Sequence, residues 1–204
     1  MRKQCTSGFT LIEMLTVLVI VAILAGITIT AMHNVGRSTA LHTASRQLAD
    51  QINKARNYAL ANGTYVYMVV ATDQTTPTDP NYPFTSFGFC VSAVTNPANI
   101  GSALSNVRYV ENIQRLPTGT VFSNYVANVG SANVSFPNSG SITHPAWVVT
   151  FTASGQILPL MRTPQFIVQR GSYDPTTKKP IRTEPNYDKI EINTLIGKPI
   201  VSSF

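Results

Sequence analysis

The sequence has few charged residues and few cysteines, and both shortages limit what the protein can be. Charged residues make up 12% of the 204-residue chain, and none lies between Met14 and Met32. Of the two cysteines, Cys5 lies in a short polar leader, so a chain that loses this leader keeps only Cys90 and has no internal disulfide. We expect Cys90 to be a buried small apolar residue, because no histidine or cation that would activate a thiol stands beside it.

Patterns that carry catalytic or metal chemistry are also missing from the sequence. None of the three histidines, His33, His42 and His144, stands at metal-ligand spacing from a cysteine or carboxylate. The sequence has no Gly-rich phosphate loop and no Gly-x-Ser-x-Gly elbow. We therefore expect no enzymatic activity, no cofactor and no metal site.

What the sequence does have is one long apolar stretch, residues 8–32, with Glu13 as its single charge. Its length meets the roughly 20 apolar residues that a bilayer-spanning helix needs. A secretory signal peptide has a shorter apolar region, and a plain anchor with Arg2 and Lys3 in the cytoplasm leaves a carboxylate in hydrocarbon without a partner. A third interpretation is cleavage after Gly8, which gives Phe9 a new α-ammonium group that could pair with Glu13.

The segment Gly8-Phe9-Thr10-Leu11-Ile12-Glu13 resembles the processing motif of type IV prepilins. The resemblance implies that a prepilin peptidase/methyltransferase cuts between Gly8 and Phe9 and methylates Phe9, and that Glu13 registers the subunit in a filament. It also implies other pilin or pseudopilin subunits and an inner-membrane assembly platform as partners. The chain would then cross the bacterial inner membrane once, with its N-terminus cytoplasmic and its remaining domain periplasmic or carried into a filament.

A helical pattern continues beyond the apolar stretch. Apolar residues recur at spacings of three and four, which is one face of an α-helix, and they are Leu41, Ala44, Leu48, Ile52, Ala55 and Ala59. Gly63 is a helix stop signal. The sequence therefore predicts a removed leader at 1–8, a helix at 9–62 whose part 9–32 is transmembrane, and a globular domain at 63–204.

Residues 63–204 have the composition of an antiparallel β domain. Runs rich in β-branched and aromatic residues predict strands at 64–70, 84–91, 106–113, 120–126, 133–136, 146–151, 156–158, 166–170 and 189–193. Residues 174–185 are expected to form a long loop. The predicted fold class is α+β, with a long helix packed on a β-sandwich-like domain. This order of parts, with Gly197-Lys198 after a strand in a closing segment at 190–201, resembles GspH/FimT-like minor pilins and pseudopilins.

The last quarter of the chain is rich in cations. Some FimT-like minor pilins bind DNA through a basic C-terminal region, and phosphate contacts here would use Lys178, Lys179, Arg182 and Lys198, with Tyr173 or Tyr187 offering a stacking surface. Our main interpretation is a structural subunit of a type IV pilus or a type II secretion pseudopilus, between which the sequence does not choose. The alternatives are a DNA-binding minor pilin and an anchored periplasmic protein that never polymerises.

Overall fold

The computed structural model describes residues 10–72, 83–92, 104, 107–137, 143–158 and 162–204, without the side chains of 27–38. It divides into two compact units, Met1–Thr39 and Ala40–Phe204. The boundary falls inside the single helix, α1 (Leu11–Asn62), so the second half of this helix belongs to the same unit as the sheets. We call that unit the head.

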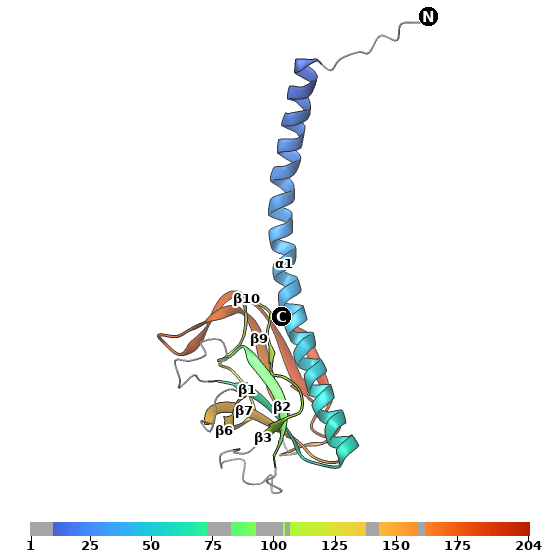
Figure 1. Cartoon of the computed structure of the whole chain (residues 1–204), viewed down its shortest axis with the longest axis vertical. Helices are drawn as coiled ribbons and strands as arrows, with labels where there is room; N and C mark the ends of the chain where they lie inside the picture. The colour runs from blue at the N-terminus through green and yellow to red at the C-terminus, as the bar shows by residue number, and fades with distance from the viewer. Residues whose placement is uncertain (1–9, 73–82, 93–103, 105–106, 138–142, 159–161) are drawn as a thin grey trace, which may run out of the picture. The chain divides into compact units, whose positions relative to one another are not determined.

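Helix α1 (Figure 1) ends where the sequence predicts. Gly63 follows it with φ of 60°, in the left-handed region that favours glycine. The Thr64 amide donates to the Ala59 carbonyl at 3.3 Å, which satisfies one of the last free carbonyls of the helix. Over the described residues the helix extends from Leu11 to Asn62.

The amphipathic half of α1 supplies one wall of the core of the head. All six apolar residues of the predicted stripe, from Leu41 to Ala59, are buried. They pack in one cluster with inward-facing residues of both sheets, including Phe122, Val168 and Ile190. In Figure 1 this part of the helix runs alongside β9 and β10.

The head contains two antiparallel sheets. The first has the order β3-β2-β1-β7-β6, with β4 paired to β2 and β8 paired to β7. Its strands are β1 (Val66–Ala71), β2 (Ser86–Ser92), β3 (Val107–Tyr109), β4 (Gln114–Arg115), β6 (Gly130–Ser135), β7 (Thr143–Phe151) and β8 (Ile157–Leu158). The second has the order β11-β10-β9-β5, from β5 (Thr120–Phe122), β9 (Gln165–Asp174), β10 (Lys179–Ile192) and β11 (Pro199–Ser203). The fold class is α+β, as predicted.

Strand β1 is buried on both faces and separates two apolar clusters. Val66, Met68 and Val70 belong to the cluster that includes α1. Tyr67 and Val69, which point the other way because side chains alternate along a strand, belong to a second cluster that also contains Cys90. The burial of Cys90 is confirmed, with 0% of its surface exposed.

The prediction of a long loop at 174–185 is wrong. Strands β9 and β10 instead form a hairpin joined by a turn at 175–178. Asp174 closes this turn, because its carboxylate accepts a hydrogen bond from the Thr176 amide at 2.9 Å and another from the Thr177 hydroxyl at 2.6 Å. The pairing register shifts between Arg182 and Tyr187, so the irregularity lies within a strand rather than in a loop.

The segment at 190–201 lies at the edge of the second sheet. It comprises the end of β10, a turn, and the start of β11, which pairs antiparallel with β10. At the end of this pairing Tyr187 and Phe204 exchange both backbone hydrogen bonds, at 3.0 and 2.9 Å. Strand β11 is the last strand of its sheet on that side.

Candidate functional site

The start of α1 is closed by a reciprocal hydrogen-bond pair between Thr10 and Glu13. The Glu13 amide donates to the Thr10 hydroxyl oxygen at 3.3 Å, and the Glu13 carboxylate accepts from the Thr10 amide at 3.4 Å and from its hydroxyl at 3.3 Å. This is a capping box, in which Thr-x-x-Glu satisfies free amides of the first helical turn. The sequence interpretation assigned Glu13 only to assembly, although the Thr-x-x-Glu spacing is itself a signal for this cap.

The first turns of α1 expose a continuous apolar surface. Each of the large apolar side chains here is at least 48% exposed, and they are Leu11, Ile12, Met14, Leu15, Val17, Leu18, Val19, Ile20, Val21, Ile23 and Leu24. An apolar surface of this extent marks a site of protein–protein or membrane contact. Within the described part of the chain, no helix is both long enough and apolar enough to cross a membrane. Gly8 and Phe9 lie outside the described residues.

The structure brings together three of the four predicted phosphate-contacting cations. Lys178 and Lys179 are exposed at the β9–β10 turn, and Arg182 is exposed three residues further along β10. Lys198 lies beyond the other end of β10, a 14-residue strand that spans roughly 40 Å at ~3.3 Å per residue. Lys198 is therefore not part of the same cluster.

The two tyrosines predicted to offer stacking surfaces differ in their surroundings. Tyr173 packs against the core and stacks on Phe84, with ring centroids 6.1 Å apart. Tyr187 lies on the outer face of the second sheet, where its ring stacks on Phe204 at 5.2 Å and the Arg182 guanidinium carbon lies 5.3 Å from its centroid. Both tyrosines lie on the β9–β10 hairpin, where Tyr173 pairs with Pro180, but only Tyr187 has a ring contact with one of the predicted cations.

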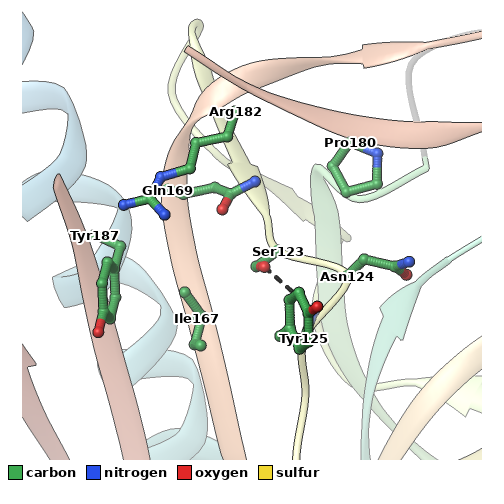
Figure 2. A pocket seen from close by; sticks show the side chains of 8 residues that line it. All are labelled: Ser123, Asn124, Tyr125, Ile167, Gln169, Pro180, Arg182 and Tyr187. Carbon is green, nitrogen blue, oxygen red and sulfur yellow. Dashed lines mark hydrogen bonds between the residues drawn. The ribbon is translucent and has the colours of Figure 1, made fainter. Parts of the chain in front are cut away.

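A hollow of about 380 Å³ opens on this outer face (Figure 2). Its lining includes Asn124, Tyr125, Ile167, Gln169, Arg182 and Tyr187. Arg182 is fixed at one side, because its Nε donates to the Glu184 carbonyl at 2.7 Å. The hollow thus combines aromatic surface, amide groups and one guanidinium. Of these residues, the sequence singled out only Arg182 and Tyr187.

A second polar cluster joins α1 to β10 inside the head. Asp188 is fully buried, and its Oδ2 accepts from the Ser45 hydroxyl at 2.5 Å and lies 3.4 Å from His42 Nδ1. Its Oδ1 has no hydrogen-bond partner among the described residues. No sequence pattern could have found this cluster, since 143 positions separate Ser45 from Asp188. Within the described residues, no three His, Cys, Asp or Glu side chains are grouped to hold a metal ion.

The N-terminal segment matches a known family model. Residues 3–29 match the model described as the prokaryotic N-terminal methylation motif. This match covers Gly8, Phe9 and the capped start of α1. The motif thus stands at the start of a long helix that carries an antiparallel β domain.

Among solved structures, the chain is similar to the type IV minor pilin FimU of Pseudomonas aeruginosa in two crystal forms. In one, the sequences are 12% identical over 81% of this chain and 90% of FimU, with a TM-score of 0.44. In the other, they are 13% identical over 79% and 92%, with a TM-score of 0.42. No curated protein matches the sequence.

Proposed function

We propose that this protein is a structural subunit, a minor pilin or pseudopilin, that is cut after Gly8, methylated on Phe9 and assembled through the N-terminal half of α1. The observation that carries the proposal is the exposed apolar surface of α1, which begins at Leu11 inside an N-terminal methylation motif. Such a surface needs other apolar helices or lipid around it. We assign the protein a structural rather than a catalytic role.

In this proposal the predicted segment 9–32, part of which lies outside the described residues, rests in the inner membrane before assembly. During assembly the apolar helices exchange lipid for one another. Glu13 favours this exchange only where the new α-ammonium group of a neighbouring Phe9 neutralises it, because an unpaired carboxylate is costly in an apolar environment. A prepilin peptidase, an assembly platform and other pilin subunits are the partners that this route requires.

In this proposal Glu13 has two functions, as the partner of Thr10 in the capping box and as a charge in assembly. Substitutions can separate the two. Glu13→Gln keeps an N3 side chain that can accept the cap hydrogen bond but removes the charge, whereas Glu13→Ala removes both. We expect both variants to be processed normally and to enter filaments about tenfold less or worse, since breaking a buried ion pair costs about 3–5 kcal/mol. The measurements are mass spectrometry of the mature N-terminus and the amount of subunit in sheared filaments.

Thr10→Ala is the matched control, because it removes the cap partner and leaves the charge. We expect it to be incorporated nearly as well as the unmodified protein. The opposite result would overturn the proposed mechanism. If Glu13→Gln were incorporated normally and Thr10→Ala were not, capping would matter for assembly and the charge would not.

The two alternatives, a DNA-binding minor pilin and an anchored protein that never polymerises, have less support from the structure. DNA binding would rely on Lys178, Lys179 and Arg182 without Lys198, which lies beyond the other end of β10. A gel shift of the head with labelled DNA, weakening steeply with salt, would favour it. A non-polymerising anchored protein would show no crosslinks between cysteines introduced in α1 and pilin partners.

A further inference from the structure

The hollow on the outer face of the second sheet has two tyrosine rings and an apolar floor that face water. Tyr125 is 81% exposed, although its backbone amide is held by the Ser123 hydroxyl at 3.2 Å. Tyr187 is fixed between Phe204 and Arg182. In Figure 2 Ile167 lies between the two rings. The exposed Tyr125 ring beside an aliphatic side chain forms a surface suited to the apolar face of a small ring.

Gln169 gives this hollow a polar side chain. Its side chain is one of those that line the hollow (Figure 2), and the residue is only 6% exposed. Its side-chain amide makes no hydrogen bond to any other residue in the described part of the chain. A primary amide carries two donors and one acceptor, so in this hollow it can bond the hydroxyl groups of a ligand.

Arg182 determines which charge a ligand of the hollow can carry. Its Nε is engaged by the Glu184 carbonyl, while its terminal nitrogens have no hydrogen-bond partner among the described residues, so they are free to hold a carboxylate. No other cation lines the hollow, since Lys178 and Lys179 lie outside it. A nucleic-acid strand needs a series of cations along its phosphates, whereas a single guanidinium suits one carboxylate on a neutral, hydroxyl-rich body.

We propose that this hollow binds an acidic saccharide, a sugar unit that carries one carboxylate. The carboxylate pairs with Arg182, the hydroxyls bond Gln169 and Asn124, and the C–H face of the ring packs on Tyr125. The volume of about 380 Å³ lies in the range of small-ligand sites and accommodates one ring of an oligosaccharide. This site belongs wholly to the head and does not depend on assembly through α1.

The test uses the head, Ala40–Phe204, which contains both apolar clusters within itself. Isothermal titration with trigalacturonate should give saturable binding, and neutral maltotriose should bind at least about tenfold more weakly, a difference of ~1.4 kcal/mol. Arg182→Gln and Tyr125→Ala should each weaken trigalacturonate binding by about tenfold or more. Lys178→Gln removes a cation of the same hairpin outside the hollow and should change the affinity by less than about twofold.

Several results would overturn the proposal. One is the absence of saturable trigalacturonate binding up to about 10 mM. Another is equal weakening by Lys178→Gln and Arg182→Gln, which would mean general attraction to a polyanion. A third is tighter binding of a thymidine oligonucleotide that depends on the same two lining residues, which would assign the hollow to nucleic acid. If Arg182→Gln fails to fold, the affinity of Tyr125→Ala for trigalacturonate tests the proposal instead. This variant should fold, because the exposed Tyr125 side chain makes no hydrogen bond to another described residue.

Discussion

Asp188 shows how a single buried residue ties the helix to the sheet. Its carboxylate is removed from water on the inner face of β10, and the Ser45 hydroxyl and His42 Nδ1 approach it from α1. A buried carboxylate without donors is costly. The same hydroxyl lies 3.0 Å from the Leu41 carbonyl within the helix, so Ser45 has polar partners on both elements.

Removing the Ser45 hydroxyl should destabilise the head. We expect Ser45→Ala to lower the free energy of unfolding by about 1.5–3 kcal/mol, the usual range for a hydrogen bond to a charged group. Urea denaturation of the head measures this change. Thr43→Ala, an exposed position on the same helix, is the control and should change stability by less than about 0.5 kcal/mol. Equal effects of the two substitutions would mean that helix propensity dominates instead.

Elements with a strong periodic pattern could be predicted from the sequence, and elements defined by their neighbours could not. Spacings of three and four fixed the buried face of α1 through Ala59, because one helix face packs on the core. The β9–β10 hairpin was mistaken for a loop because its residues include Pro180, Pro185 and several charges, which are disfavoured in strands. Pairing with β9 outweighs this composition, since β9 supplies the backbone partners.

The residues of the candidate site also divide into those that the sequence could predict and those that it could not. Glu13 could be found because its motif is local in the sequence. The hollow could not, since Asn124, Gln169 and Tyr187 come from three separate segments that only the sheet pairing brings together. Gln169 carries no sequence signal at all, because its significance is its place in the lining of the hollow.

Two glycines at turns test how closely elements approach one another. Gly63 and Gly197 both have φ near 60°, but a Cβ on Gly63 meets open space, whereas one on Gly197 would overlap the Gly155 carbonyl oxygen. Gly63→Ala should cost about 1–2 kcal/mol from backbone strain alone. Gly197→Ala should cost about 1–3 kcal/mol more from overpacking. Thermal unfolding of the two head variants, measured side by side, checks the difference, and equal costs would mean that the neighbouring turn yields freely.

At the scale of the whole head, β1 connects the two apolar clusters and should make them unfold together. Trp147, the only tryptophan, packs against the cluster that contains α1, whereas Cys90 lies in the other cluster. Burial raises the pKa of the Cys90 thiol to about 12, so about one thiol in 10⁴ is ionised at pH 8. These two residues therefore report on the two clusters independently.

We expect Cys90 to resist a thiol reagent in the native head and to react readily in urea. The urea midpoints from Cys90 labelling and from Trp147 fluorescence should coincide, as two-state unfolding requires. Labelling of Cys90 well before the change in Trp147 fluorescence would show that the second cluster opens separately.

The edge formed by β11 matters for a protein proposed to polymerise. Since Tyr187 and Phe204 exchange both backbone hydrogen bonds, the alternation of an antiparallel pair turns the backbone groups of Val201, Ser203 and Pro199 away from β10. Pro199 has no N–H to offer. The outer edge is thus short and poor in donors, which discourages uncontrolled sheet-to-sheet growth. Subunits crowded together by their helices would then stay separate at their heads, and growth would be directed along one axis rather than into aggregates.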